Sequence, residues 1–353
     1  MINKRIVLLL ALITSAAAQD SPARRKVFID QDIRGPAGTD QQSMLVLLQS
    51  PQVQVLGISV TSGDGWARAG VPNVLRMLEL TGHAEVPVAL GAQFPLVNSQ
   101  EETKAWESQF GEVNYKGAWN ERNYIAPDAV PPAPAGEPSI KPVPQHGSDL
   151  LYQMVSKYPG EVTVWAAGPL TTVAMAVRLH PDLPSLAKEL VMMGAGINEE
   201  KGGIQRPNGR REFNWWFDPE ATRIVLSAPW KKITVTPLDI SVKTAGSTPR
   251  LREALAKSDA RVAKYLIQYG YRGTGGGGYM YDEIAAAAWI DHTLVTKQQD
   301  LWINIDIDHG ASYGQTIFVE KDVKVPSWWK LATVQFDLDT ERFYKMYLEL
   351  MSK

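Results

Sequence analysis

The sequence of 353 residues contains no cysteine. Disulfide bonds and thiolate chemistry are therefore excluded, so the hydrophobic core has to stabilise the fold by itself. An excess of charge of one sign is missing as well, because 36 Lys and Arg residues balance 38 Asp and Glu residues to a formal net charge of -2. Without a long basic run, the chain lacks the electrostatic signature of proteins that bind nucleic acid. We therefore expect a small-molecule partner and no nucleic acid.

Long hydrophobic runs are scarce, and the one stretch of this kind lies near the N-terminus. Residues 1–18 combine the cations Lys4 and Arg5 with a short apolar core and end in Ala16-Ala17-Ala18. This pattern is typical of a cleaved secretory signal peptide. The apolar core is shorter than the roughly 20 residues that span a bilayer as a helix. We expect a mature chain of residues 19–353 that is secreted or periplasmic and has no membrane attachment after cleavage.

Apolar runs and helical patterns alternate along most of the remaining chain. Residues 53–60 and 86–90 predict strands, and residues 71–80 between them predict a helix. The alternation continues with a helix at 147–155, a strand at 162–167, a helix at 171–179 and a strand at 190–193. Such alternation is typical of an α/β fold with a central, mostly parallel, Rossmann-like open sheet flanked by helices. Because no linker divides the chain, we expect a single domain.

Residues 97–145 interrupt this regular pattern. The periodicity fails there, and residues 127–144 are rich in proline. A long segment without a repeating apolar pattern is usually a surface loop or an active-site lid. We therefore interpret residues 97–145 as an inserted lid.

Three acidic residues crowd one short segment of the chain. Asp30 and Asp32 follow an apolar run, and Asp40 comes after a Gly/Pro loop at the start of a helical pattern. In open α/β sheets, ligands bind in the crevice between strand ends and helix starts. Carboxylates gathered there repel one another and need a cation, shared protons or solvent. The alternative interpretation is an exposed acidic turn in which Asp40 only caps the following helix.

Six motifs along nearly the whole mature chain together resemble the calcium-dependent nucleoside hydrolases, the family of the inosine-uridine preferring enzymes. In order, they are Ile29-Asp-x-Asp32 with Asp40, Val55-Leu-Gly-Ile58, Ala167-Gly-Pro-Leu-Thr-Thr172, Met192-Met-Gly-Ala-Gly196, Glu212-Phe-Asn214 with Phe217-Asp-Pro-Glu-Ala221, and Tyr281-Asp282. The resemblance implies an α/β enzyme that hydrolyses the N-glycosidic bond of ribonucleosides. It also implies a Ca²⁺ cofactor and a homodimer or homotetramer.

The resemblance assigns a metal-binding role to four residues. Asp32 matches the aspartate that contacts the calcium ion and takes a proton from the bound water, and Asp30 would support it. Asp40 matches the bidentate ligand, Thr171 matches the residue that offers its backbone carbonyl, and Asp282 completes the set. Calcium takes six to eight oxygen ligands, which leaves places for a water and two sugar hydroxyls. On local pattern alone, Thr171 is equally explained as a helix cap, and Asp282 as an acid favoured by a helix dipole.

The resemblance also assigns residues to the substrate. Glu212 and Asn214 match the pair that holds the ribose hydroxyls, and Asn208 is a third residue of this kind. Asp64 matches a residue near the sugar and the leaving group. Because Glu212 and Asn214 alternate, we predict that both side chains lie on one side of an extended segment.

Thr39 marks the first departure from the family pattern. It stands where the family commonly has the first of two adjacent aspartates, and the loop before it is longer by about three residues. The sequence Asp40-Gln-Gln-Ser-Met-Leu45 resembles a less characterised, often secreted branch of the superfamily. A threonine can hydrogen-bond a sugar hydroxyl, but it cannot share charge with a metal. We therefore expect Thr39 to contact the substrate and to alter its recognition.

Tyr281 marks the second departure. Some members of the family have a histidine there as a general acid, whereas purine-preferring members have an aromatic residue that stacks on the base. Together with Asp64, Tyr281 therefore favours a purine nucleoside. We expect Tyr281 either to donate a proton to the base or to stack on it, with Trp66, Trp106 or Trp119 on the opposite face.

Three functions are compatible with these residues. The first is a secreted calcium-dependent N-ribohydrolase, and the second is a hydrolase that acts on another glycoside or nucleoside derivative. The third is a binding protein that captures a sugar or nucleoside through calcium without turning it over. Asp32 argues against the third function, because binding alone has no evident need for a base.

Overall fold

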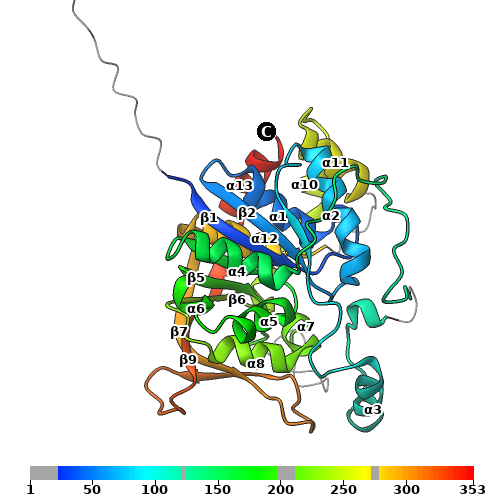
Figure 1. Cartoon of the computed structure of the whole chain (residues 1–353). Helices are drawn as coiled ribbons and strands as arrows, with labels where there is room; N and C mark the ends of the chain where they lie inside the picture. The colour runs from blue at the N-terminus through cyan, green and yellow to red at the C-terminus, as the bar shows by residue number, and fades with distance from the viewer. Residues whose placement is uncertain (1–22, 121–123, 198–210, 272–277) are drawn as a thin grey trace, which may run out of the picture.

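The computed structural model describes residues 23–120, 124–197, 211–271 and 278–353 (Figure 1). The predicted signal peptide and Asn208 lie outside the described residues. No helix in the described ranges is long and apolar enough to cross a membrane.

A sheet runs through the centre of the molecule (Figure 1). In the described residues it has nine strands in the order β3-β2-β1-β4-β5-β6-β9-β7-β8. Their bounds are β1 Arg25–Gln31, β2 Val53–Val60, β3 Val88–Leu90, β4 Val162–Ala166, β5 Glu189–Met193, β6 Ile233–Thr236, β7 Val295–Ile305, β8 Thr316–Glu320 and β9 Lys330–Leu338. The strands from β3 to β9 in this order pair in parallel, whereas β7 is antiparallel to both of its neighbours. The predicted mostly parallel sheet is confirmed.

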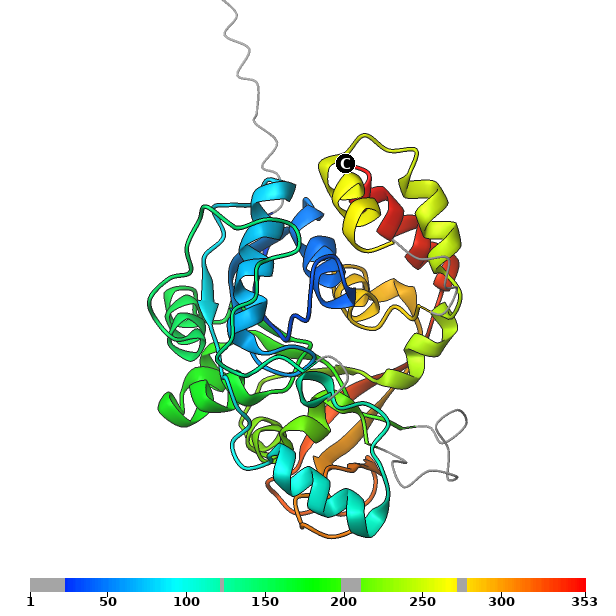
Figure 2. The same cartoon turned by 90° about the vertical axis from the view of Figure 1, so that its right-hand side faces the viewer.

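Helices cover both faces of the sheet. The first face carries α1 Thr39–Gln49, α2 Ala67–Thr81, α10 Thr248–Leu255, α11 Arg261–Tyr269, α12 Asp282–Ile290 and α13 Thr340–Met351; the second carries α4 Gly147–Lys157, α5 Thr171–Leu179, α6 Leu183–Leu186 and α8 Pro219–Ser227. In Figure 2 the yellow helices α10 and α11 lie beside the red helix α13. Because side chains alternate along a strand, Val27 and Ile29 of β1 pack into the first layer and Phe28 packs into the second.

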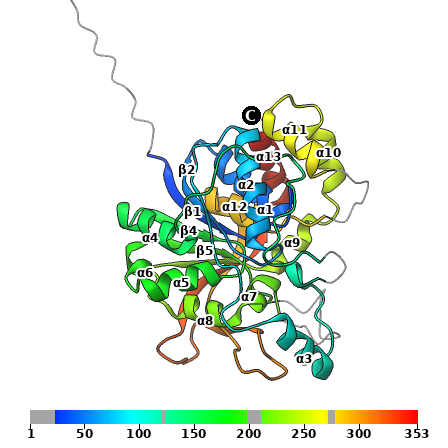
Figure 3. The same ribbon diagram turned by 45° about the vertical axis from the view of Figure 1, so that its right-hand side comes forward.

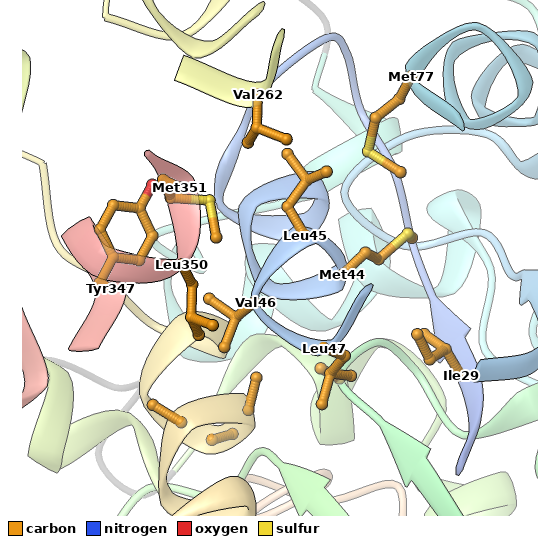
Figure 4. Close-up of a cluster of buried hydrophobic side chains, with 14 of the residues drawn as sticks. Ile29, Met44, Leu45, Val46, Leu47, Met77, Val262, Tyr347, Leu350 and Met351 are labelled. Atoms are coloured by element: carbon orange, nitrogen blue, oxygen red, sulfur yellow. The ribbon is translucent and has the colours of Figure 1, made fainter. Parts of the chain in front are cut away.

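Helix α1 is surrounded by other elements rather than lying at the surface. Its residues Met44–Leu47 are all buried, and Figure 4 shows them packed against side chains from four other elements: Ile29 of β1, Met77 of α2, Val262 of α11, and Tyr347, Leu350 and Met351 of α13. A helix that is apolar on all sides is a buried helix. This packing fixes the point where α1 begins, and α1 begins with Thr39 and Asp40.

The inserted segment 97–145 contains regular structure that the sequence did not predict. Helix α3 spans Gln100–Phe110, and a 3₁₀ turn, η1, spans Gly117–Trp119. Ser99 caps α3 by accepting a hydrogen bond from the backbone N–H of Glu102 at 3.1 Å. The helix lies at the periphery of the molecule (Figure 3), where Trp106 Nε1 donates to the carbonyl of Gly310 at 2.8 Å.

Candidate active site

A cavity of about 420 Å³ opens at the edge of the sheet where the parallel strands end. Asp32 follows β1, Asp64 follows β2, Ala167 follows β4, and Met193 ends β5; all four line the cavity. This is the ligand-binding edge of an open α/β sheet. The chain therefore gathers residues from four separate strands at one place.

Helix starts form much of the rest of the polar wall, to which Asn114 and Arg211 also contribute. Thr39 and Asp40 begin α1, Asp282 begins α12, and Asn214 belongs to the first turn of α7 Phe213–Phe217. The N-terminus of a helix carries a partial positive charge, which favours carboxylates placed there. The predicted site residues that line the cavity are Asp32, Thr39, Asp40, Asp64, Glu212, Asn214, Tyr281 and Asp282.

The cavity concentrates negative charge. Asp32, Asp40 and Asp282 are 2%, 4% and 4% exposed. Burial, followed by repulsion from the neighbouring carboxylates, raises the pKa of all three well above its usual range. Burial also raises the pKa of Asp64 to about 6, although the nearby charge of Arg34 opposes this shift. The fold therefore holds four carboxyl groups that cannot all ionise without a counter-charge.

Asp32 is held in place by the loops after β2 and β4. Its Oδ2 accepts a hydrogen bond from the backbone N–H of Asp64 at 2.7 Å. A Cβ atom at Gly63 would lie 2.2 Å from the same oxygen, and one at Gly168 would lie 2.8 Å from Asp32 Cβ. Both glycines therefore let the backbone approach the carboxyl group closely.

Gln31 is a site residue that the sequence analysis missed. Its side-chain amide donates to Asp282 Oδ2 at 2.8 Å and to Ser43 Oγ at 3.3 Å, and its Oε1 accepts from the backbone N–H of Asp32 at 3.1 Å. Gln31 is fully buried and links β1 to both α1 and α12. Its place between two aspartates was the available signal, but an amide on a strand has no characteristic spacing.

Asp30 lies beneath the cavity and does not line it. The residue is fully buried and accepts a hydrogen bond from the hydroxyl of Ser59. Burial raises the pKa of Asp30 to about 7. This placement is compatible with the supporting role expected for Asp30.

The donor chemistry at the cavity fits a hard cation. Oδ1 of Asp64 is buried and has no hydrogen-bond partner within the described residues, and Asp32, Asp40 and Asp282 repel one another. Buried carboxylates of this kind are the ligands that calcium prefers. However, among the residues that the structure describes, no three Asp, Glu or His side chains form a ready-made metal site. The donor types therefore fit calcium, whereas a closed ligand shell is not preformed.

The side chain of Thr171 is engaged outside the cavity. This residue begins α5 and does not line the cavity, and its hydroxyl donates to Asp218 Oδ2 at 2.6 Å. Ala167, four residues earlier, lines the cavity, and its backbone carbonyl accepts a hydrogen bond from Asn214 Nδ2 at 3.1 Å. The predicted metal contact through the backbone carbonyl of Thr171 therefore stays a prediction.

Glu212 and Asn214 are brought to the cavity by a helix start, not by an extended segment as predicted. Glu212 is the N-cap of α7, and its carboxylate accepts the backbone N–H groups of Asn214 at 2.9 Å and of Trp215 and Ala195 at 3.1 Å. Burial raises the pKa of Glu212 to about 7. Asn214 donates to the carbonyls of Ala167 and Met193. Both side chains therefore carry structural hydrogen bonds at the cavity wall.

Tyr281 lines the cavity immediately before Asp282. Burial raises the pKa of its phenol to about 12, so the hydroxyl is protonated at neutral pH. The other aromatic residues at the cavity are Tyr115, Phe213 and Trp216. One region of the cavity is thus acidic, and another presents aromatic rings.

The predicted stacking partners Trp66, Trp106 and Trp119 do not line the cavity. Trp66 Nε1 donates to the carbonyl of Ile125 at 2.8 Å, and Trp119 stacks on Phe217 at 4.2 Å between ring centroids. These tryptophans pack the inserted segment onto the body of the protein. Trp66 is therefore corrected from a substrate-binding residue to a packing residue.

Thr39 reaches the cavity, but its hydroxyl is already engaged. Thr39 Oγ1 donates to Oε2 of Glu283 at 2.6 Å. Burial raises the pKa of Glu283 to about 8. Glu283 does not itself line the cavity and was not predicted as a site residue.

A family model described as inosine-uridine preferring nucleoside hydrolase matches residues 27–345. The chain belongs to this family. Its members are N-glycosyl hydrolases. The single α/β domain, with its cavity lined by acids at strand ends and helix starts, fits this membership.

Individual relatives agree with the family assignment. A probable uridine nucleosidase 2 of Arabidopsis thaliana is 31% identical over 245 residues, which cover 69% of this chain and 68% of the relative. An inosine-uridine preferring nucleoside hydrolase of Leishmania major is 25% identical, with 93% of this chain and 98% of the relative covered. A solved plant nucleoside hydrolase superposes with a TM-score of 0.71 at 23% identity, covering 93% of this chain and 99% of its own. The last likeness supports the fold alone.

Proposed function

We propose that the protein is a secreted, calcium-dependent hydrolase that splits ribonucleosides, preferentially purine ribonucleosides, into free base and ribose. The observation that carries this proposal is the group of three buried aspartates, with the partly buried Asp64, in a cavity that also presents aromatic rings. The names of the relatives extend to both uridine and inosine. The purine preference rests on Tyr281 and Asp64.

Asp32 is the proposed proton acceptor. When bound, a calcium ion held by Asp32, Asp40, Asp282 and the Thr171 carbonyl would offset the charge of the carboxylates and lower the pKa of a water. The backbone N–H of Asp64 orients one Asp32 oxygen, so a proton can pass to a fixed carboxylate. General-base catalysis of this kind contributes about 10²- to 10⁴-fold in rate.

The remaining residues act on the sugar and the base. Cleavage of an N-glycosidic bond builds positive charge on the sugar, and fixed carboxylates nearby stabilise that charge. Thr39 and Asn214 are the proposed contacts to sugar hydroxyls. A flat base would lie against the rings of Tyr281 and Trp216, and the protonated hydroxyl of Tyr281 is available to donate to the leaving group.

Thr39 also supports a second candidate substrate. Because a threonine replaces a charged residue at the cavity, a glycoside or nucleoside derivative with a different sugar remains the alternative substrate on the same scaffold. Export through residues 1–18 and assembly into a homodimer or homotetramer are parts of the proposal that rest on the sequence and the family.

The decisive experiment measures free base and ribose released from a panel of purine and pyrimidine ribonucleosides, with calcium and with EDTA. We expect release with calcium, fastest for a purine ribonucleoside, and strong inhibition by EDTA. Asp32→Asn should reduce the rate at least 10²-fold while the protein stays folded.

Three results would contradict the proposal or one of its parts. The hydrolase function is wrong if no ribonucleoside is cleaved under any condition. Stabilisation against heat by a nucleoside without turnover would instead favour a binding protein. Faster release from a pyrimidine panel would retain the hydrolase and reject the purine preference.

A further inference from the structure

A hydrogen bond joins the starts of two helices beside the cavity. Thr39 is the first residue of α1, and Glu283 is the second residue of α12. Thr39 Oγ1 donates to Glu283 Oε2 at 2.6 Å across 244 positions of sequence. Each helix also contributes its neighbouring aspartate, Asp40 or Asp282, to the cavity. Thr39 is therefore next to Asp40 in the sequence, and Glu283 is next to Asp282.

The hydroxyl of Thr39 does not serve as an ordinary helix cap. Threonine near a helix start usually hydrogen-bonds the backbone of its own first turn. Helix α1 instead begins after Gly38 without a side-chain capping bond, and the Thr39 hydroxyl reaches a different helix. This use of the side chain calls for another explanation.

The bond to Glu283 determines what Thr39 presents to the cavity. A hydroxyl has one hydrogen to donate and two lone pairs to accept with. Glu283 takes the hydrogen and fixes the side-chain torsion, so the oxygen of Thr39 offers its lone pairs. An oxygen in this state accepts a hydrogen bond from a hydroxyl of the bound molecule.

Glu283 itself does not contact the bound molecule. It is 1% exposed, does not line the cavity, and is also held by the backbone N–H groups of residues 281 and 283. A carboxyl group fixed in this way provides a rigid acceptor for Thr39. Glu283 can therefore act on a ligand through Thr39, through the spacing of the two helices, or through its charge, which raises the pKa of Asp40 and of Asp282.

We propose that Glu283 is a positioning residue for substrate selection: it holds Thr39 so that the threonine oxygen accepts a hydrogen bond from a 2′- or 3′-hydroxyl of the sugar. This inference rests on the proposed function and adds a selectivity element to it. The pair makes the enzyme prefer ribonucleosides over nucleosides that lack that hydroxyl.

The test compares a ribonucleoside with its 2′-deoxy and 3′-deoxy counterparts, using the full chain with calcium. Thr39→Val should lower kcat/KM for the ribonucleoside about tenfold, the size of one lost hydrogen bond. For one of the two deoxy compounds, kcat/KM should be unchanged. Thr39→Ser should retain the preference because it keeps the hydroxyl.

Glu283 variants test the positioning role. Glu283→Leu should reduce the preference as much as Thr39→Val does, whereas Glu283→Gln should retain it because an amide oxygen still accepts from Thr39. In the double variant Thr39→Val with Glu283→Leu, the loss should not exceed the larger single loss. Calcium affinity, measured by titration, should change little in the Thr39 variants. Because the charge of Glu283 acts on Asp40 and Asp282, the Glu283 variants are compared at saturating calcium.

A matched control distinguishes selection from stability. The hydroxyl of Thr163 also donates to a buried carboxylate, that of Glu189, at 3.1 Å, but neither residue lines the cavity. Thr163→Val should lower the melting temperature and leave the ratio of ribo- to deoxyribonucleoside turnover unchanged.

Several outcomes would overturn the inference. One is a ratio of ribo- to deoxyribonucleoside turnover that is unchanged in Glu283→Leu, and another is an equal loss of preference in the Gln and Leu variants. The others are additive losses of preference in the double variant and an effect confined to calcium affinity. If Glu283→Leu does not fold, Glu283→Ala, which also lacks an acceptor for Thr39, takes its place. If the wild type hydrolyses no ribonucleoside, the proposed function fails, and the dissociation constants of the same three nucleosides then test the preference.

Discussion

Gly63 shows how closely the backbone approaches the proposed catalytic carboxylate. A methyl group at this position would place its carbon 2.2 Å from Asp32 Oδ2 and 2.5 Å from Pro169 Cδ. The proline ring cannot give way, so Asp32 would have to rotate. A displacement of about 1 Å at a catalytic group can cost about 10²-fold in rate. We therefore expect Gly63→Ala to lower kcat at least tenfold.

The loop after β1 offers a control for that substitution. A Cβ atom at Gly35 would meet nothing within 4 Å. Gly35→Ala should therefore leave kcat and the melting temperature nearly unchanged. Steady-state kinetics and thermal unfolding of both variants check the prediction, and equal activity of the two would show that Asp32 tolerates displacement.

At the scale of elements, the start of α1 depends on Gln42. Its Oε1 accepts the hydroxyls of Tyr271 at 2.9 Å and Tyr347 at 2.5 Å, and its Nε2 donates to the carbonyl of Ala37 at 2.9 Å. Gln42→Ala would leave buried partners without hydrogen bonds, at a cost of roughly 1–3 kcal/mol. We expect the free energy of unfolding, measured in urea, to fall by about 2 kcal/mol.

Gln52 provides the comparison for Gln42. It follows α1 and is exposed, so Gln52→Ala should change the free energy of unfolding by less than about 0.5 kcal/mol. Similar values for the two variants would show that the contacts of Gln42 do not stabilise the start of α1.

Some elements follow from local pattern, whereas others depend on tertiary contacts. β2 and α5 have the bounds that their apolar periodicity predicts, 53–60 and 171–179. Helix α7 has only five residues, too few for a helical period to emerge, so Glu212 and Asn214 resembled an extended segment. Helix α3 buries little of its surface, although Ser99 and Glu102 carried the signature of a helix start.

The site residues also differ in whether the sequence predicts them. Acids at strand ends and helix starts are readable, because their position relative to the apolar runs marks the edge of the sheet. The amide of Gln31 carries no such signal, since a single amide forms no motif. The sequence also could not show that Trp66 packs the inserted segment, because that depends on residues distant in the chain.

At the scale of the whole molecule, buried carboxyl groups make stability depend on pH. Burial raises the pKa of Glu212 to about 7 and that of Asp218 to about 6, from about 4 in the unfolded chain. Such groups bind more protons in the folded state, so the free energy of unfolding falls as pH rises from about 4 through these values. Without metal, the melting temperature should therefore fall between pH 5 and pH 8.

Other titratable groups change the stability in a different pH range or by a smaller amount. Hydrogen bonds lower the pKa of Glu79 to about 2, so its stabilising effect is complete above pH 5. Burial lowers the pKa of His83, which opposes the trend because a neutral histidine is favoured as pH rises. Calorimetry in EDTA at pH 5, 6, 7 and 8 measures the balance, and Glu212→Gln should reduce the slope.

Calcium should reverse this dependence, because the ion binds ionised carboxylates and not protonated ones. The gain in melting temperature on adding calcium should therefore be larger at pH 8 than at pH 5. Magnesium at the same concentration is the control, since it demands stricter octahedral geometry and releases water reluctantly. A melting temperature that rises with pH in EDTA would contradict the assignment of uncompensated buried acids. A calcium effect that is equal at both pH values would place the ion away from these acids.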